Sequence, residues 1–262
     1  MNETISCMLN RTSLRSFSDK PIEDEVRTLL KQATVQAPNG GNMMCYSVLE
    51  ITDQNRKDEL CTLCEGQIMI SKAPLVWIFL ADFQKWDTYF KESGAVERAG
   101  RDAVPYRAPG LGDLHIAMQD AIIAAQSAVV AAQSLGIGSC YIGDVIMEYD
   151  KVARLLKLTP YTIIATMVVF GYPKNTESRP KPMDRCPIDA IFHENEYKEP
   201  HLGEMERAYA AMEAKLARQN RLPYGNTGTL ADYSYLGKHT APYRIAMNDS
   251  AKAFTHAWEQ QE

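Results

Sequence analysis

The chain has 262 residues, of which 45% are hydrophobic and 23% charged, and a formal net charge of −5 at pH 7. This length is enough for one sizeable α/β core or for two modest domains. The 28 basic and 33 acidic residues are spread evenly, so no field of one sign is available to hold a nucleic-acid backbone. We therefore expect no nucleic-acid partner.

The N-terminal segment and the cysteines indicate where the protein works. Residues 1–12 have no basic segment followed by an apolar run, so we expect no export signal and a cytoplasmic protein. The most apolar stretch, residues 114–137, is interrupted by polar residues every turn or two, which predicts a buried helix rather than a membrane span. Six cysteines then fit reduced cytosolic thiols.

Cys61 and Cys64 form a C-x-x-C pair inside a helical-looking run, residues 55–65. A second pair is lacking, and no strand comes directly before it, so two core cysteines are favoured over a redox or zinc site.

Turn and helix signals divide the first half of the chain. Residues 3–10 predict a short helix, and Pro21 opens a second helix that runs to residue 37. Between the two helices lies a basic loop. After a strong break at residues 38–42, residues 46–51 alternate as a strand should, and residues 74–80 predict another strand. Residues 82–110 have no clear period and are typical of an irregular cover over a site.

The second half opens with an alanine-rich helix, residues 114–135, that is apolar around most of its surface and therefore requires burial on nearly all sides. In a chain this small, that pattern indicates a subunit interface. The later segments predict strands at residues 139–142 and 162–170, and helices at 148–158, 200–220 and 248–261. Strands and helices mixed in this way predict an α+β fold with one layered core. The tail is too poor in apolar runs to bury a core of its own, so we expect it to wrap a partner or cover the site.

Two clusters of basic residues could bind an anion. Arg11, Ser13 and Arg15 put two guanidinium groups and a hydroxyl on one loop, which suits a phosphate. Further along, Arg179 and Lys181 alternate with prolines, so an extended backbone would point both basic side chains to one side. An anion site and a pair of solvated basic turns remain alternatives on these residues alone.

Several common kinds of site are absent from the sequence. Gly136, Gly138 and Gly143 lack the spacing of a dinucleotide-binding loop, and we expect them to end the long helix and to let the backbone approach something flat. There is no nucleophile elbow, H-E-x-x-H motif or P-loop, and the histidines are not paired at metal-ligand spacing. Anion binders, glycines, amides and aromatics remain, and these suit an organic redox cofactor.

These residues resemble a family. The run from Arg11 to Phe17, followed by Pro21, is similar to the opening signature of the FMN-dependent nitroreductases. Further matches follow in the expected order: residues 38–42, Gly66-Gln67, the helix from Asp120 to Gly138, Tyr141-Ile142-Gly143, and Arg179 to Pro182 with His193 to Tyr197. The resemblance spans about residues 4–200 and is closest to the oxygen-insensitive NADPH nitroreductases and flavin reductases.

The resemblance implies a central mixed sheet flanked by helices, and an interlocked homodimer with FMN at its interface. Residues 1–200 would form the FMN-binding domain, and residues 201–262 a C-terminal extension of the same domain. Arg11, Ser13, Arg179 and Lys181 would hold the FMN phosphate, Arg15 and Gln67 would face the ribityl chain and the polar edge of the ring, and residues 141–143 would lie against the isoalloxazine. The whole predicted cofactor-binding set is Arg11, Thr12, Ser13, Arg15, Pro38, Asn39, Gly40, Asn42, Gln67, Tyr141, Ile142, Gly143, Arg179 and Lys181.

The chain also departs from the family pattern. Many members have Ser and Gln where this chain has Asn39 and Met44, and a basic residue where it has Thr12. We therefore expect fewer phosphate contacts. In the tail helix, Lys215, Arg218 and Arg221 stand where the subgroup keeps basic residues for the NADPH phosphate, but a solvated helix face is the favoured interpretation.

The function implied is transfer of a hydride from NADPH or NADH, through N5 of FMN, to a nitroaromatic, quinone or similar small electrophile. Two half-reactions at one pocket would need no catalytic protein nucleophile and no metal. The alternatives are a flavin reductase or another reductase of the same fold, a flavin-binding sensory protein with little turnover, and a thiol-redox protein that uses Cys61 and Cys64. Residues 83–110 would set the choice of acceptor.

Overall fold

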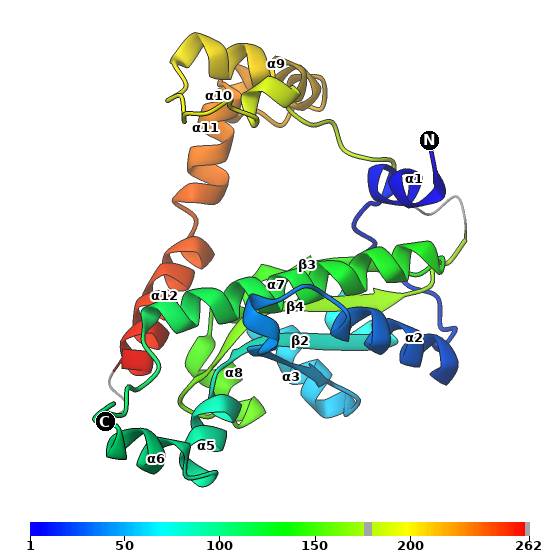
Figure 1. Cartoon of the computed structure of the whole chain (residues 1–262). Helices are drawn as coiled ribbons and strands as arrows, with labels where there is room; N and C mark the ends of the chain where they lie inside the picture. The colour runs from blue at the N-terminus through cyan, green and yellow to red at the C-terminus, as the bar shows by residue number, and fades with distance from the viewer. Residues whose placement is uncertain (176–179, 260–262) are drawn as a thin grey trace. The chain divides into compact units, whose positions relative to one another are not determined.

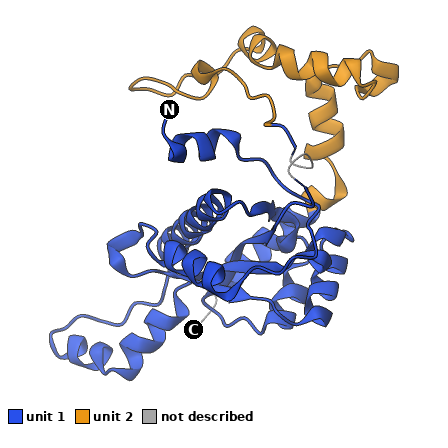
Figure 2. Ribbon diagram, turned by 90° about the vertical axis from the view of Figure 1, so that its right-hand side faces the viewer, with its two compact units in different colours: residues 1–181, 246–262 blue, residues 182–245 orange. Residues whose placement is uncertain are grey.

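The computed structural model describes residues 1–175 and 180–259. The chain divides into two compact units, which are coloured separately in Figure 2. The first consists of residues 1–181 and 246–262, and the second of residues 182–245.

The first unit contains a sheet and most of the helices (Figure 1). Its strands are β1 (Tyr46–Glu50), β2 (Leu75–Asp82), β3 (Gly138–Ile142) and β4 (Thr162–Gly171). Its helices are α1 (Glu3–Asn10), α2 (Asp24–Val35), α3 (Gln54–Leu63), α4 (Ile68–Lys72), α5 (Gln84–Glu92), α6 (Ala95–Arg101), α7 (Leu111–Ser134), α8 (Tyr149–Leu156) and the later part of α12 (Pro242–Glu259). Two short 3-10 helices, η1 (Gly40–Asn42) and η2 (Gly143–Ile146), lie in connecting segments.

The strands follow the order β1-β2-β4-β3, and each pairs antiparallel with its neighbour. Within the described ranges, the parallel pairing is a single isolated bridge between Ser13 and Ser139. The α+β class predicted from the sequence is confirmed. The sheet, which was expected to be mixed, is antiparallel in its four strands, because the parallel bridge joins β3 to a loop residue and not to another strand. Because β1 and β3 are the two edges, the segments attached to them are held at opposite sides of the sheet.

Both faces of the sheet are covered because β2 alternates between two cores. Val76 and Ile78 pack with residues of α3, α4 and α8, whereas Trp77 and Phe79 pack with residues of α2 and α7. Figure 1 shows α7 along one face of the sheet and α3 with α8 on the other. Each large side chain that is fully buried in this way contributes roughly 1.5–3 kcal/mol. The first unit is therefore a three-layer structure with the sheet in the middle.

Helix α7 lies on the sheet through a row of small residues. Apart from Ala131, its alanines between Ala117 and Ala132 are buried, and these small side chains let the helix approach the strands closely. Among the described residues, α7 is the one helix long and apolar enough to cross a membrane, but its row of buried alanines makes it a core helix. Burial on nearly all sides, as predicted, is not reached within one chain. Its apolar residues Ile116, Ile122 and Ile123 are between 38% and 46% exposed.

Two predicted boundaries were wrong. Residues 82–110 are not irregular, because they contain α5 and α6. Trp86 and Phe90, four residues apart on α5, pack tilted at 5.5 Å between ring centroids, and the pattern is too short to show a period in the sequence. Helix α12 begins at Pro242 rather than at residue 248. Proline is favoured in the first turn of a helix, a signal that we applied to Pro21, where the helix begins only at Asp24, and did not apply to Pro242.

The second unit is built from short helices. They are η4 (Ile188–Ala190), α9 (Leu202–Arg218), α10 (Pro223–Asn226), α11 (Leu230–Ser234), the π-helical turn η5 (Tyr235–His239) and the start of α12. Polar contacts hold it together: Leu230 N donates to Glu213 Oε2 at 2.6 Å, and Arg221 Nη2 to the Tyr233 hydroxyl at 2.9 Å. Among the described residues of this unit, Leu222 is the one buried apolar side chain. A unit this poor in buried side chains has no hydrophobic core of its own.

Candidate functional site

The basic loop, residues 11–17, is fixed to β3 and β4. Leu14 N donates to Ser139 O at 2.9 Å, and Ser18 N donates to Tyr172 O at 2.9 Å. Leu14 and Phe17 are buried, at 3% and 7% exposed. The backbone bonds and the two buried side chains together set the register of the loop along the sheet.

Glycines make room for both buried side chains. A Cβ at Gly138 would lie 2.3 Å from Leu14 Cδ2, and one at Gly171 would lie 2.6 Å from Phe17 Cδ1. Real Cβ atoms do not approach other atoms so closely, so only glycine fits these two positions. The sequence predicted that Gly138 lets the backbone approach something flat. That expectation was wrong, because what occupies the space is the side chain of Leu14.

Two of the four predicted phosphate binders, Arg11 and Ser13, lie with Arg15 on the loop that is bonded to β3. Because Leu14 points into the core, its neighbours on an extended backbone point the other way. Burial raises the pKa of the Cys140 thiol. The positive charges of Arg15 and Arg11 and a hydrogen bond with Ser13 act to lower this pKa. Burial likewise raises the pKa of Tyr141 to about 12, against the positive charge of Arg11. The backbone bridge between Ser13 and Ser139, next to the hydrogen bond of Leu14, holds the loop that carries these residues alongside β3.

Gln67 joins the same group from the start of α4. Its Nε2 donates to Oδ2 of Asp144, which directly follows Gly143 in η2. Gly143 is exposed, and no atom lies within 4 Å of the place where its Cβ would be. The backbone at the end of β3 is therefore open to a flat ligand. Sequence reasoning missed Asp144, and the available signal was an acidic residue immediately after Tyr141-Ile142-Gly143.

Residues 38–44 form a strained loop that is held by α7. Asp120 is 2% exposed, and its carboxylate accepts from Gly40 N at 2.9 Å and from Cys45 N at 3.1 Å. Backbone φ is positive at Gly41, Asn42 and Met44, with values of 60°, 56° and 49°. A non-glycine residue in this region costs about 1–3 kcal/mol, and such strain persists where surrounding structure enforces it, often at functional sites. Asp120 is thus a residue with a role that its sequence position did not indicate.

One chain does not bring these two groups together. The loop 38–44 leads into β1, whereas Tyr141, Ile142 and Gly143 end β3, and these strands are opposite edges of the sheet. Three spacings between adjacent strands amount to about 14 Å. The predicted residues therefore fall into a first group (Arg11, Thr12, Ser13, Arg15, Gln67, Tyr141, Ile142 and Gly143) and a second group (Pro38, Asn39, Gly40 and Asn42).

The remaining predicted residues lie elsewhere. Arg179 is outside the described residues, and Lys181 is exposed in a segment without regular structure. In the second unit, Lys215 Nζ pairs with Asp184 Oδ2 at 2.9 Å, and Arg221 contacts the Tyr233 hydroxyl. The structure thus engages two of the three tail basic residues in contacts within their own unit.

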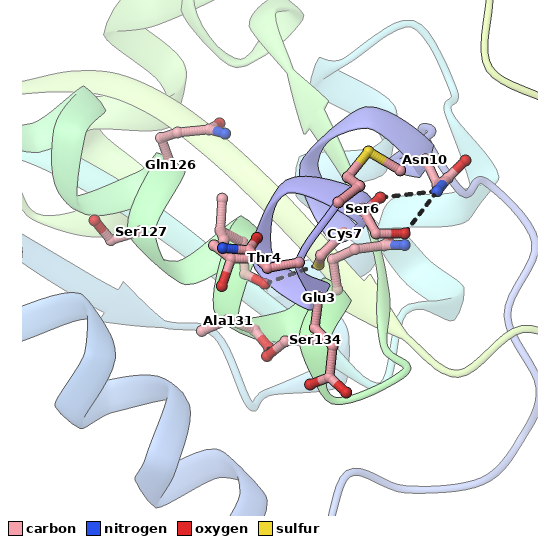
Figure 3. Close-up of a pocket in the computed structure, with 13 residues that line it drawn as sticks. Glu3, Thr4, Ser6, Cys7, Asn10, Gln126, Ser127, Ala131 and Ser134 are labelled. Carbon is pink, nitrogen blue, oxygen red and sulfur yellow. Dashed lines mark hydrogen bonds between the residues drawn. The ribbon is translucent and has the colours of Figure 1, made fainter.

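A cavity of about 970 Å³ lies between α1 and α7 (Figure 3). Cys7 Sγ donates to Val130 O across it at 3.8 Å, and Asn10 points back to Ser6. None of the predicted cofactor-binding residues within the described ranges lines this cavity. Because α1 has no buried residue, the cavity is a feature of an uncovered surface rather than of the site at β3.

The buried C-x-x-C pair does not suit thiol chemistry. Cys61 and Cys64 are free thiols, and both are buried. Burial, with the negative charge of Asp144 as a smaller cause, raises the pKa of Cys64 to about 12. Because the thiolate is the reactive form, a thiol with such a pKa is a poor nucleophile at neutral pH. The geometry weighs against the thiol-redox alternative.

Comparison with known proteins agrees with the motif series. Residues 8–172 match the model of the nitroreductase family. The chain is 31% identical to an FMN reductase (NADPH) of Bacillus subtilis over 198 residues, which cover 75% of each protein. It is 28% identical to an oxygen-insensitive NADPH nitroreductase of Salmonella typhimurium over 200 residues, or 76% of each.

The fold agrees as well. The structure of an NADPH:FMN oxidoreductase of Vibrio harveyi complexed with NAD+ matches 97% of this chain and 98% of its own, with a TM-score of 0.78 and 24% identity. At that identity the match establishes the fold alone. Since the family model covers more than half of the residues and contains both the basic loop and the end of β3, the chain belongs to the nitroreductase family, as its motifs predicted.

Proposed function

We propose that the chain is an FMN-dependent oxidoreductase that passes a hydride from NADPH or NADH to a nitroaromatic, a quinone or a similar electrophile. The family and the relatives named as an FMN reductase and an NADPH nitroreductase support this function. When bound, FMN supplies hydride chemistry at its N5. The observation that carries the proposal is the loop with Arg11, Ser13 and Arg15, which is bonded along β3, the strand that ends at the open backbone of Gly143.

The donor set fits FMN. Arg11 and Ser13 offer charged and hydroxyl donors to a phosphate, a combination that gives strong hydrogen bonds. Arg15 and Gln67 face the ribityl chain and the polar edge of the ring, where a positive group favours negative charge on the flavin. Gly143 leaves space for a flat ring. Arg179 and Lys181 complete the proposed phosphate set.

The protein works as a homodimer, and a second copy completes the site. The second group of predicted residues, in the loop 38–44, lies at the opposite edge of the sheet from Gly143. In addition, α1 exposes Ile5, Met8 and Leu9, and α7 exposes Ile122 and Ile123; these five apolar side chains are together called the α1–α7 face. These side chains are 38% to 63% exposed, and a partner that covers them gains the free energy of apolar burial. The coreless second unit serves as the extension that wraps the partner.

Residues 83–110 contact the acceptor. Contacts among Asp87, Lys91 and Tyr106 hold this segment in place. Asp87 is 3% exposed and accepts from Lys91 Nζ at 2.8 Å and from the Tyr106 hydroxyl at 2.7 Å. Tyr89, in contrast, is 62% exposed on the same helix. This combination of a fixed segment and exposed aromatic side chains suits small aromatic acceptors. The enzyme acts in the cytoplasm, without a membrane or nucleic-acid partner.

The test is an absorbance spectrum of the purified protein before and after anaerobic addition of NADPH, and again after addition of an acceptor. We expect flavin bands that bleach with NADPH and return with a nitroaromatic or a quinone. A protein that shows no flavin bands, even after incubation with FMN, would refute the proposal. A flavin that NADPH does not bleach would favour the sensory alternative instead.

A second candidate function is reduction of free flavin, which the relative named FMN reductase (NADPH) supports. The same NADPH-reduced protein is mixed anaerobically with free FMN and, separately, with a nitroaromatic. Faster reoxidation by free FMN at equal concentration would identify a flavin reductase, and the opposite order would identify a nitroreductase.

A further inference from the structure

We propose that Asp144 is a positioning residue of the flavin site, which orients the amide of Gln67 and places a negative charge beside the ring. The inference rests on the proposed function and extends it to a residue outside the predicted set. It starts from the hydrogen bond in which Gln67 Nε2 donates to Asp144 Oδ2.

The chemistry of this contact fixes which end of the Gln67 amide is available. A carboxylate can only accept hydrogen bonds, and the amide nitrogen of glutamine can only donate. Nε2 is therefore committed to Asp144, and Oε1 is the end left for a ligand. A flavin ring carries a donor N–H on its polar edge, and Oε1 is an acceptor that matches it. Without Asp144, the amide could rotate and present either end.

Both partners sit on fixed backbone. Gln67 precedes α4, where Ile70 N donates to Gln67 O at 2.9 Å and Ile70 is fully buried. Asp144 is the second residue of η2, where Met147 N donates to Asp144 O at 2.9 Å and Val145 is fully buried. Cys64 is also fully buried, and the negative charge of Asp144 contributes to its raised pKa. The contact therefore joins two anchored segments and is not a meeting of two mobile surface side chains.

The charge of Asp144 opposes that of Arg11 and Arg15. Those guanidinium groups favour an anionic reduced flavin, whereas a carboxylate next to Gly143 disfavours it. Asp144 is half-buried, so solvent screens its charge less than that of an exposed residue. The site would thus bind reduced flavin less tightly, relative to oxidised flavin, than its cationic loop alone would. This difference lowers the midpoint potential of the bound flavin and makes the reduced enzyme a stronger electron donor to its acceptor.

Two variants separate the charge from the orientation. Asp144→Asn keeps an oxygen that accepts from Gln67 Nε2 and removes the charge. We expect its affinity for reduced relative to oxidised FMN to rise about tenfold, which for two electrons is an upward shift of about 30 mV in midpoint potential. Its Kd for oxidised FMN should stay within about twofold of wild type. Asp144→Ala should show the same potential shift and, in addition, bind oxidised FMN about tenfold more weakly.

A double-mutant cycle with Gln67→Ala tests whether the effect on binding passes through Gln67. In that background, Asp144→Ala should cause no further loss of FMN affinity but should still raise the potential. The matched control is Asp150→Asn, which removes one negative charge from an exposed position on α8 and should change neither quantity. Kd is measured by flavin fluorescence titration of the apoprotein, and the potential by anaerobic equilibration with reference dyes.

Unchanged potentials in both flavin-loaded Asp144 variants would overturn the inference and leave the proposed function standing. The inference would also be overturned if Asp144→Ala caused the same loss of FMN affinity in the wild type and in the Gln67→Ala background. If Asp144→Asn does not fold, Asp144→Ala carries the same test of the potential. A wild-type protein that binds no FMN would overturn the proposed function itself, which is a distinguishable result.

Discussion

At the scale of single residues, two glycines decide where the basic loop lies. Gly138 and Gly171 sit on β3 and β4 and leave the spaces that Leu14 and Phe17 fill. The charged residues that we propose to bind FMN alternate with these buried ones. A shift of Leu14 therefore also displaces Ser13 and Arg15, its direct neighbours.

We predict that Gly138→Ala weakens FMN binding. The added methyl group would lie 2.3 Å from Leu14 Cδ2, so Leu14 and its loop must move. Overpacking of this kind costs about 1–3 kcal/mol of folding free energy, and we expect FMN affinity to fall about tenfold. Fluorescence titration with FMN and thermal unfolding measure the two effects.

The control is Gly112→Ala, in the first turn of α7, where nothing lies within 4 Å of the added methyl group. Alanine is the better helix former by about 1 kcal/mol, so this variant should be no less stable and should bind FMN normally. If Gly138→Ala bound FMN as tightly as wild type, the loop would not be set by that glycine.

The residues that carry chemistry differ in how visible they were in the sequence. Arg11, Ser13, Arg15 and Gln67 could be picked out because their residue types and order match a known series. Asp144 was missed although it directly follows Tyr141-Ile142-Gly143, and Asp120 was noted only as the start of a motif, because an acidic residue in a helix is ordinary. What gives Asp120 its role is its place beside Gly40 and Cys45, which are 80 and 75 positions away in the chain.

At the scale of elements, the helix α7 and the loop 38–44 act together. The loop has three positive φ values, and the carboxylate of Asp120 binds both of its ends. Asn39 Oδ1 also accepts from Met44 N at 3.0 Å, and Trp86 Nε1 donates to Met43 O at 2.7 Å. The loop is exposed at Pro38 and Asn42, yet its shape is determined from within.

We predict that Asp120→Asn weakens the free energy of FMN binding by more than it lowers the free energy of unfolding. The amide nitrogen of asparagine cannot accept, so one of the two backbone N–H groups loses its partner, at a cost of about 1–3 kcal/mol. The released free energy of strain favours a relaxed loop that no longer presents its predicted binding residues. FMN titration and chemical denaturation are measured together.

A matched control is Asp113→Asn on the same helix. Asp113 accepts from Gly110 N at 2.8 Å and pairs with Arg107, so its loss weakens the start of α7 without touching the loop. We expect comparable destabilisation and normal FMN binding. Equal loss of FMN affinity in both variants would mean that only the stability of α7 matters.

Regular elements were predicted well where the hydrophobic pattern was long. The strands and α7 fall within a few residues of their expected positions, because an alternating or continuous apolar run is a strong signal. The short helices α4, α5, α6, α10 and α11 were not predicted, since one or two turns give too few residues to establish a period. Their formation depends on contacts such as the packing of Trp86, which a single sequence does not reveal.

At the scale of the whole molecule, the α1–α7 face predicts assembly. We expect Ile122→Glu to shift the protein from dimer toward monomer and to lower FMN content with it. The reason is that a carboxylate buried without a partner is costly, whereas the isoleucine is 42% exposed in the single chain.

Analytical ultracentrifugation measures the shift. Val104→Glu, at a position 56% exposed within residues 83–110, is the control and should remain dimeric. A fully dimeric Ile122→Glu protein would place the interface elsewhere.

Stability should fall at alkaline pH. Burial raises the pKa of Tyr149 and of Cys64 to about 12 and that of Cys45 to about 11. These groups keep their protons in the folded state above pH 9, where the unfolded chain begins to lose them. The stabilisation is therefore complete below about pH 9 and is lost as pH rises toward 12. Each group whose ionisation is suppressed in the folded state lowers the free energy of unfolding by about 1.4 kcal/mol per pH unit in that window.

Denaturation curves between pH 8 and pH 11 check this expectation. Cys64→Ala removes one of the groups and should flatten the slope, although the cavity it leaves lowers stability at every pH. A slope unchanged by that substitution would show that Cys64 does not contribute.

The distribution of the cysteines has a practical consequence. Cys45, Cys61, Cys64 and Cys140 are buried, whereas Cys7 and Cys186 are partly exposed. A maleimide added to the native protein should therefore label two sites quickly, and the other four only when the chain opens. The rate of labelling at those four positions, read by mass spectrometry of peptides, reports how often each part of the first unit opens. The protein carries its own set of probes for local unfolding, and none has to be engineered into it.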